Sequence, residues 1–169
     1  DLVTGVQTCA LPICSYRMHR RFVLSLALSS LATAALARSP TPEPAQVTVY
    51  KSPSCGCCAA WVDHLLSAGL NVEAIDVDHY ELQALKVRMG IAPELSSCHT
   101  AILDGYFVEG HVPADDIKRL MAERPDALGL TVPGMPIGSP GMEMGSEREA
   151  FDTLLVQKDG TTEIFAQHA

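Results

Sequence analysis

Apolar residues fall along the chain in two patterns, short runs and helically spaced positions. The short runs are rich in β-branched and aromatic side chains and predict strands. These strands cover residues 47–50, 72–77, 100–103 and 106–108. Residues 57–68 place apolar side chains at helical spacing and are followed by Gly69, so we expect a helix that ends there.

Two further helices are expected in the same part of the chain. Residues 81–89 fit a second helix, which ends at Gly90. Pro113 opens a third helix that runs through Met121. Two aspartates occupy the first turn of this helix, where the helix dipole favours negative charge.

Aspartate–glycine pairs predict tight turns at two places. Asp104-Gly105 would join the third and fourth strands, and Asp159-Gly160 would join a last pair of strands at residues 151–157 and 161–165. Without this last pair the element order is β-α-β-α-β-β-α, which is the order of the thioredoxin fold. We therefore predict an α/β fold, a thioredoxin-like mixed sheet flanked by helices, with an added C-terminal β-hairpin.

The first 17 residues are predicted to be foreign to the protein. They have neither helical nor strand periodicity, and residues 3–13 resemble the in-frame translation of a sequencing-library adapter. We interpret residues 1–17 as a non-native extension, and we assign no role to the two cysteines in it, Cys9 and Cys14.

Residues 18–37 have the three parts of a secretory signal peptide. Basic residues follow Met18, a short apolar stretch comes next, and a small-x-small cleavage site precedes Arg38. A Pro-rich linker at residues 38–46 then leads into the predicted domain at residues 47–169. The mature protein is predicted to be secreted, with no membrane attachment after cleavage.

The charge of the chain and its missing motifs argue against several functions. The 169 residues include 12 Lys and Arg against 20 Asp and Glu, a formal net charge of −8. Such an acidic chain is a poor nucleic-acid binder because little in it would neutralise phosphates. The sequence also lacks a P-loop, a dinucleotide-binding Gly-x-Gly-x-x-Gly turn, a Gly-x-Ser-x-Gly elbow and a His-Glu-x-x-His motif.

Candidate chemistry gathers in Cys55-Gly56-Cys57-Cys58, between the first strand and the first helix. Cys55 and Cys58 have Cys-x-x-Cys spacing, and Cys57 adds a third thiol. A thiol at a helix N-terminus faces unpaired backbone N–H groups and the positive end of the dipole, which favours the thiolate. Because thiolates both attack disulfides and bind soft metals, the motif alone leaves redox and metal chemistry open.

A fourth cysteine favours the metal. In thioredoxin-like folds the segment before the third strand faces the Cys-x-x-Cys loop, and here that segment contains Cys98 and His99. Cys98 is therefore expected to bring a fourth sulfur to the loop; the alternatives are a small buried residue or a disulfide with one loop cysteine. The adjacent Cys57 and Cys58 cannot readily face one tetrahedral zinc, but they could serve different metals in a thiolate-bridged cluster. Soft sulfur ligands select Cu(I).

Further candidate ligands lie downstream. The loop of residues 132–144 carries three methionines among Gly and Pro, and Met142 and Met144 have the x-Met-x-Met pattern of periplasmic copper binders. The alternative is a loop that caps the domain with flexible apolar side chains. His111, after the fourth strand, is a candidate ligand as well. Among the remaining histidines, His64 and His79 are expected at the surface, and His168 is expected in the C-terminal tail.

Three separated motifs resemble the CopG-type copper-resistance family of bacteria. They lie at residues 50–58, 97–101 and 105–113, and the resemblance spans residues 47–165. It implies a periplasmic thioredoxin-like protein with a cysteine-bridged cluster of more than one copper ion. It also implies interconversion of Cu(I) and Cu(II) during copper detoxification. The implied cluster ligands are Cys55, Cys57 and Cys58, with Cys98 matching the other family cysteine.

We therefore predict a periplasmic copper-binding protein that contributes to copper resistance and has copper ions, and other periplasmic copper-handling proteins, as partners. The predicted metal ligands are Cys55, Cys57, Cys58, Cys98, His111, Met142 and Met144. Two alternatives stay open. One is a thiol–disulfide oxidoreductase with Cys55 as nucleophile and Cys58 as resolving thiol, and the other is a passive copper chaperone.

Overall fold

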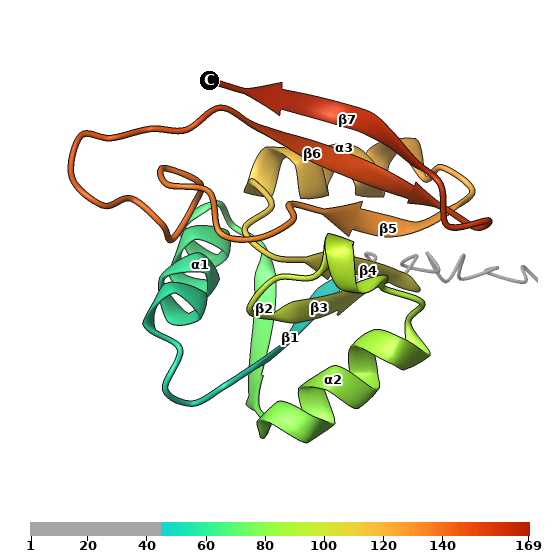
Figure 1. Ribbon diagram of the computed structural model, residues 1–169, viewed down its shortest axis with the longest axis horizontal. Coiled ribbons are helices and arrows are strands. Elements are labelled where there is room, and N and C mark those ends of the chain that lie inside the picture. Colours follow the sequence, from blue (N-terminus) through green and yellow to red (C-terminus); the bar gives the residue numbers. More distant parts are fainter. Residues whose placement is uncertain (1–44) are drawn as a thin grey trace, which may run out of the picture. The chain divides into compact units, whose positions relative to one another are not determined.

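The computed structural model describes residues 45–169 (Figure 1). The predicted non-native extension, the predicted signal peptide and the linker up to residue 44 lie outside the described residues. The domain was predicted to start at residue 47, and in the structure its first strand begins one residue earlier, at Gln46.

A seven-stranded sheet forms the centre of the described domain, with the strand order β2-β1-β3-β4-β5-β6-β7. Its strands are β1 (Gln46–Lys51), β2 (Asn71–Asp76), β3 (Thr100–Leu103), β4 (Tyr106–Glu109), β5 (Ala127–Thr131), β6 (Phe151–Gln157) and β7 (Thr162–His168). The helices are α1 (Gly56–Ser67), α2 (His79–Arg88), α3 (Ala114–Glu123) and the single 3-10 turn η1 (Pro93–Leu95).

The first four strands form a mixed sheet. Strand β1 pairs in parallel with β2, and α1 makes the connection between them. On its other side β1 pairs antiparallel with β3, which forms a hairpin with β4. The predicted α/β class and mixed sheet are confirmed, and this strand order is consistent with a thioredoxin-like core.

Strand β5 was not predicted, and it joins the C-terminal hairpin to the main sheet. It pairs in parallel with β4 and antiparallel with β6. Its middle residue is Gly129, and glycine weakens the strand signal because it offers no side chain to pack. The structure needs glycine there, because a β-carbon would overlap the carbonyl group of Phe107 on β4. The β6–β7 hairpin is therefore a continuation of one sheet.

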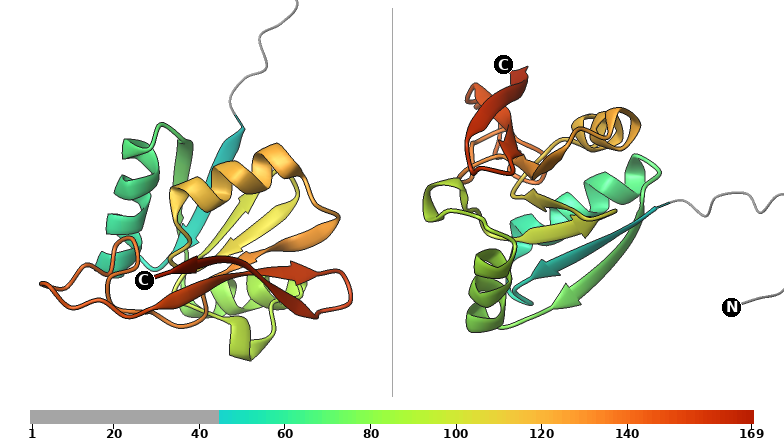
Figure 2. Two further views of the ribbon diagram at one scale, coloured as in Figure 1. Left: turned by 90° about the horizontal axis from the view of Figure 1, so that it is seen from above. Right: turned by 90° about the vertical axis from the view of Figure 1, so that its right-hand side faces the viewer.

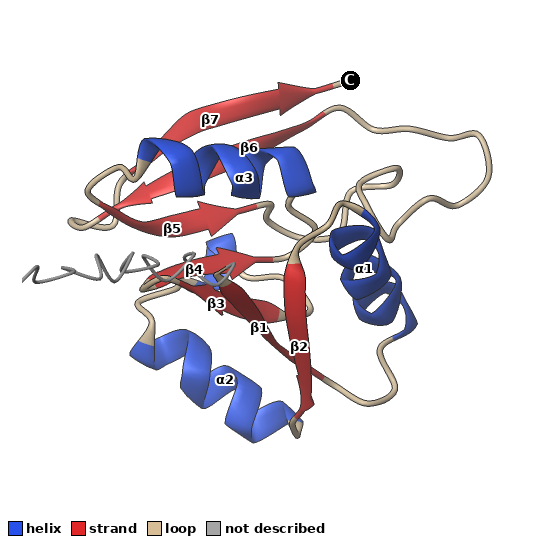
Figure 3. Ribbon diagram, turned by 180° about the vertical axis from the view of Figure 1, so that it is seen from behind, coloured by secondary structure: helices blue, strands red, loops and turns tan. Residues whose placement is uncertain are grey.

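Helices cover both faces of the sheet. Helices α1 and α3 lie on one face and α2 lies on the other (Figures 2 and 3). The α1/α3 face buries the main hydrophobic core, around the fully buried Trp61, Leu65, Ile117 and Leu120. A smaller cluster that includes Phe107 lies on the other face of the sheet. The core thus fixes α1, and with it the cysteine loop, against the sheet.

Strand β7 continues to His168, which corrects the expectation that this histidine lies in a free tail. Its Nε2 atom lies 2.8 Å from Oδ2 of Asp116 on α3. The same carboxylate oxygen accepts a 2.6 Å hydrogen bond from the hydroxyl of Thr153 on β6. His168 therefore ties the last strand to α3.

Candidate metal centre

Cys55 is the residue that caps the N-terminus of α1. The chain leaves β1, turns so that the backbone N–H of Cys55 donates to the carbonyl of Ser52 (3.1 Å), and then enters the helix. Cys55 has extended backbone angles, and its sulfur accepts the N–H of Cys58 at 3.4 Å. This contact satisfies one of the free N–H groups of the first helical turn, which explains why the helix starts here.

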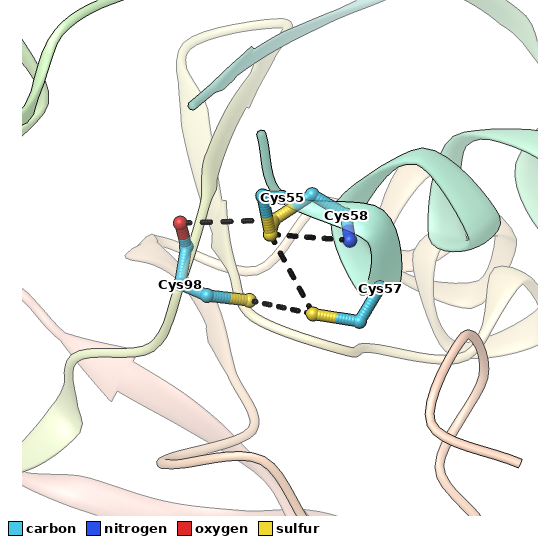
Figure 4. Close-up of side chains that lie close together, drawn as sticks. All are labelled: Cys55, Cys57, Cys58 and Cys98. Atoms are coloured by element: carbon cyan, nitrogen blue, oxygen red, sulfur yellow. Dashed lines mark hydrogen bonds between the residues drawn. A yellow bond between two sulfur atoms is a disulfide. The ribbon is translucent and has the colours of Figure 1, made fainter. Parts of the chain in front are cut away.

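Two of the four cysteines form a disulfide, Cys55–Cys58, with a Cα–Cα distance of 5.3 Å. The two remaining cysteines of the described residues, Cys57 and Cys98, are free thiols. The sulfur of Cys57 lies 3.5 Å from that of Cys55 and 3.9 Å from that of Cys98 (Figure 4). The Cys57 thiol is thus placed between the disulfide and the fourth cysteine.

The segment before β3 faces the cysteine loop, as expected from the element order. The Cys98 side chain points toward Cys57 (Figure 4), and its carbonyl oxygen lies 3.8 Å from the sulfur of Cys58. All four sulfurs lie within 4.8 Å of one another. Cys58 is fully buried, whereas Cys55, Cys57 and Cys98 are half-buried and open toward solvent.

Two buried histidines extend the cluster on the side of Cys98. The Cys98 sulfur lies 3.2 Å from Nε2 of His111 and 3.2 Å from Nδ1 of His99. Cys98, His99 and His111 form a second group whose possible ligand atoms lie within 4.8 Å of one another. The two imidazole rings meet edge to face at 5.0 Å. Cys98 therefore belongs both to an all-sulfur group and to a mixed sulfur–nitrogen group.

The backbone selects the tautomer of His111. Its Nδ1 lies 2.8 Å from the carbonyl oxygen of Pro140, so Nδ1–H donates and Nε2 keeps its lone pair toward Cys98. Metal-binding histidines commonly donate their second N–H to a carbonyl or carboxylate, which fixes the ring orientation. His111 is thus oriented as a ligand would be.

Sequence reasoning placed His99 beside Cys98 in the segment that favours a metal, but did not include it among the predicted ligands. His99 is fully buried, its ring lies at a tilt to that of Trp61 with the ring centroids 4.3 Å apart, and its Nε2 has no hydrogen-bond partner. Among residues 45–169, this Nε2 is the one buried side-chain nitrogen or oxygen atom without a hydrogen-bond partner. A buried nitrogen without a partner costs free energy, and this one belongs to the ring whose Nδ1 contacts Cys98.

Burial changes the acid–base properties of these groups. Removal from water, together with the nearby Cys57 thiol, raises the pKa of Cys98 to about 12. Burial also lowers the pKa of His99 well below its usual value, with His111 and Lys86 adding to the effect. Burial lowers the pKa of His111, against the opposing effects of the Pro140 carbonyl and Glu143. At neutral pH the metal-free site thus holds a protonated Cys98 and neutral imidazoles.

The methionine loop passes directly over the start of α1. A β-carbon at Gly141 would lie 2.7 Å from the carbonyl oxygen of Cys57, so this loop backbone lies against the helix. Met142 is half-buried, and Met144 is 66% exposed. The structure thus places the backbone of this loop beside the cysteine cluster, through Pro140 and Gly141, and the thioether ligands stay a prediction.

The expectation for His79 is confirmed and that for His64 is wrong. His79 is exposed at the start of α2. His64 is half-buried, and its Nε2 accepts the N–H of Ala114 at 3.1 Å, so it caps the N-terminus of α3. Sequence reasoning missed this role because the cap comes from another helix.

Comparison with known proteins identifies the family. Two solved structures, "Copper resistance protein copG- Form 2" and "Copper resistance protein copG- Form 1", are each 42% identical to this chain with a TM-score of 0.70. Each match covers 75% of this chain, and 100% and 98% of the respective structures. The chain belongs to the CopG copper-resistance family. Residues 95–142 also match the family described as "Protein of unknown function, DUF411", and no curated protein matches the chain.

The segment that matches the DUF411 family holds only part of the cysteine cluster. The match to the DUF411 family contains Cys98, His99, His111 and Met142, but not the Cys55-Gly56-Cys57-Cys58 loop. The cluster draws on both segments, since its sulfurs come from α1 and from the segment before β3. Soft sulfur and imidazole ligands in this arrangement suit a thiophilic metal such as copper. No helix within residues 45–169 is long and apolar enough to cross a membrane.

Proposed function

We propose that this protein binds copper through the sulfurs of Cys55, Cys57, Cys58 and Cys98 and thereby contributes to copper resistance. The observation that supports this most is the convergence of four sulfurs within 4.8 Å from two segments about 40 residues apart. A site for thiol exchange needs only a Cys-x-x-Cys pair. The two additional sulfurs have a role in a metal site and none in simple exchange.

Copper loading would require reduction of the Cys55–Cys58 disulfide. Two electrons and two protons, supplied by a dithiol, break the S–S bond and give two thiols, so that four cysteines become available. Metal ligation then needs thiolates, so copper uptake by this site would release protons. Because Cys98 is protonated at neutral pH, it is one source of these protons.

The site would hold more than one copper ion. The side chains of Cys57 and Cys58 leave adjacent residues of α1, so we propose that the two sulfurs serve different ions in a thiolate-bridged cluster. His111 would supply a nitrogen ligand from the opposite side, and Met142 and Met144 would supply thioethers from the loop above. Sulfur donors favour Cu(I) and imidazole accepts Cu(II), so we include interconversion of Cu(I) and Cu(II) in the proposal.

We further propose that the mature protein works in the periplasm. This rests on the signal-peptide pattern of residues 18–37, followed by the linker at residues 38–46. Residues 47–169 would then be the copper-binding domain, and other periplasmic copper-handling proteins would deliver or receive the metal. An oxidising compartment also agrees with the observed Cys55–Cys58 disulfide.

The direct test is an anaerobic Cu(I) titration of the reduced full-length chain against a competing chelator. Cys9 and Cys14 are replaced by serine in this background, so that only the four cluster cysteines count. The reduced protein is expected to take up more than one copper per chain, with loss of accessible thiols. Cys57→Ser should lower the Cu(I) affinity measured against the chelator roughly 10-fold or more, which is at least about 1.4 kcal/mol of binding free energy.

Ala59→Ser is the matched control, because Ala59 is exposed on the same turn of α1 and the change adds a hydroxyl without removing a sulfur. It should bind copper as the parent does. Unchanged copper stoichiometry and affinity in Cys57→Ser would refute the cluster.

One observation favours a second function, a thiol–disulfide oxidoreductase. The Cys55–Cys58 disulfide lies at the N-terminus of α1, where the helix dipole stabilises a leaving or attacking thiolate. Insulin reduction by metal-free protein would separate the two functions. Turnover that survives both Cys57→Ser and Cys98→Ser would support the oxidoreductase, whereas the copper site predicts little turnover and a strong effect of both substitutions on copper binding.

A further inference from the structure

A buried ion pair lies behind the cysteine cluster, on the α2 face of the sheet. Lys86 of α2 and Glu109 of β4 are in contact, and their side chains are 3% and 0% exposed. Lys86 Nζ also donates to the hydroxyl of Thr100 at 2.9 Å. Nothing in the copper proposal so far uses these three residues, and sequence analysis assigned none of them a role.

The Glu109 carboxylate contacts the chain on both sides of Cys98 and His99, once at a backbone N–H and once at a side-chain hydroxyl. Its Oε1 accepts the backbone N–H of Ser97 at 2.6 Å, and its Oε2 accepts the hydroxyl of Thr100 at 2.6 Å. These two donors flank the dipeptide Cys98-His99. One rigid side chain from β4 thus sets the position of two residues that point into the cluster.

Stability alone does not explain a pair of charges at this place. Removing a carboxylate and an ammonium from water costs several kcal/mol per ion, and well-packed apolar residues often serve as well or better. The charged pair instead fixes the positions of its hydrogen-bond partners. Each hydrogen bond to the carboxylate requires a defined geometry, and hydrogen bonds to a charged acceptor are stronger than those to a neutral one. The benefit is therefore expected in the placement of the residues that Glu109 holds.

We propose that Glu109 is a positioning residue that holds Cys98 and His99 against the Cys55-Gly56-Cys57-Cys58 loop, with Lys86 as its buried counter-charge. Its effect on copper rests on the proposed function, since it acts through Cys98. Its effect on the distance between the Cys57 and Cys98 thiols, 3.9 Å in the structure, does not depend on any metal. The proposal thus has a copper-free consequence.

Two variants remove both hydrogen bonds of the Glu109 carboxylate. In Glu109→Leu the side chain can accept neither the Ser97 N–H nor the Thr100 hydroxyl, whereas an amide could keep both contacts. Because this change leaves the Lys86 ammonium without its counter-charge, the double variant Lys86→Met/Glu109→Leu is made as well. The double variant keeps the chain foldable without a buried unpaired charge.

The matched control is Asp116→Leu. Asp116 is also a buried carboxylate, 7% exposed, and it also accepts the hydroxyl of a threonine, Thr153. Its other partner is His168, so it holds β6 and β7 rather than the Cys98 segment. The control therefore measures what loss of a buried, threonine-bonded carboxylate does to stability alone.

The first measurement is the effective concentration of the Cys57 and Cys98 thiols toward each other. It uses the full chain with the other four cysteines replaced by serine, equilibrated in glutathione redox buffers. Both Glu109 variants should lower this effective concentration roughly 10-fold or more, and Asp116→Leu should leave it unchanged. Equal values in the parent and in both Glu109 variants would overturn the proposal.

The second measurement is Cu(I) competition and the near-ultraviolet sulfur-to-copper absorption of the reduced chain with all four cluster cysteines. Residues that orient metal ligands typically change affinity 10- to 100-fold, so both Glu109 variants should lose roughly that much and shift the absorption band. If the parent binds copper and neither variant changes its affinity, band or thiol proximity, positioning is refuted and the copper function stands. If the variants reduce thiol proximity but the parent binds no copper, positioning stands and the copper function fails.

Discussion

Gly141 brings the backbone of the methionine loop against α1. Its φ of +85° lies in the left-handed region, and a β-carbon there would meet the carbonyl oxygen of Cys57 at 2.7 Å and the backbone N of Trp61 at 2.8 Å. Both atoms belong to the backbone of α1 and cannot rotate away, as the end of a flexible side chain could. Gly141→Ala should therefore lift the loop from the helix.

The size of the effect follows from two separable contributions. A left-handed φ costs a residue with a β-carbon about 1–2 kcal/mol, partly offset by about 0.4–1 kcal/mol from the less flexible unfolded chain. Steric overlap with fixed atoms adds about 1–3 kcal/mol. Gly145 has a φ of +71° with nothing within 4 Å of its β-carbon position, so Gly145→Ala has only the first contribution. The two variants should differ by about 1–3 kcal/mol.

Urea unfolding followed by the fluorescence of Trp61, the single tryptophan of the chain, measures both variants. Lifting the loop also removes the Pro140 carbonyl from Nδ1 of His111, so the NMR signature of this imidazole should change in Gly141→Ala and stay unchanged in Gly145→Ala. Equal free energies of unfolding for the two variants, with an unchanged His111 signal, would refute the reasoning that the loop backbone packs on α1 and orients His111.

Two further predictions concern acid–base behaviour of the metal-free protein with the Cys55–Cys58 disulfide intact. Burial lowers the pKa of His64, His99 and His111 in the folded protein. Below about pH 6.5 the unfolded chain therefore binds more protons than the folded chain. The free energy of unfolding should fall as the pH drops from about 6.5 through the lowered pKa values of the folded protein. The fully buried His99 alone contributes up to about 1.4 kcal/mol per pH unit, and a flat urea-unfolding profile from pH 7.5 to 5 would contradict this. Because its pKa is raised to about 12, Cys98 should react with iodoacetamide at pH 8 at least about tenfold more slowly than free cysteine, as measured by mass spectrometry of the alkylated peptides; a rate equal to that of free cysteine would contradict it.

Much of the fold was predictable because its signals are local. Residues 100–103 and 151–157 were predicted as strands and have those bounds in the structure, and the α1 prediction differs by one residue at each end. Short runs of apolar residues, a following glycine and Asp-Gly turns act within a few positions of each other, so they can be recognised in one sequence. The reactive-thiol motif was predictable for the same reason.

Strand β5 and the roles of several polar residues depend on partners far away in sequence. By sequence alone Gly129 weakens the strand signal, and only the nearby carbonyl of Phe107 shows why glycine is needed there. By sequence alone His64 is expected at the surface, and only the packing of α3 shows that it accepts the N–H of Ala114. The ion pair of Lys86 and Glu109 likewise forms only when α2 packs on the sheet. In each case the hydrogen bond or close approach joins segments that a local pattern cannot relate.

The sequence by its own motifs supplied the cysteines, and the tertiary structure decided how they meet. The Cys-x-x-Cys loop needed no fold to be noticed, whereas the approach of Cys98 to within 3.9 Å of Cys57 results from pairing of β3 with β1. Chain order sets the side-chain chemistry, but distances between sulfurs separated by 41 positions depend on the packed sheet. Packing also left Nε2 of His99 buried without a hydrogen-bond partner, while Nδ1 of the same ring contacts Cys98. No sequence pattern predicts this, because burial depends on the packed neighbours.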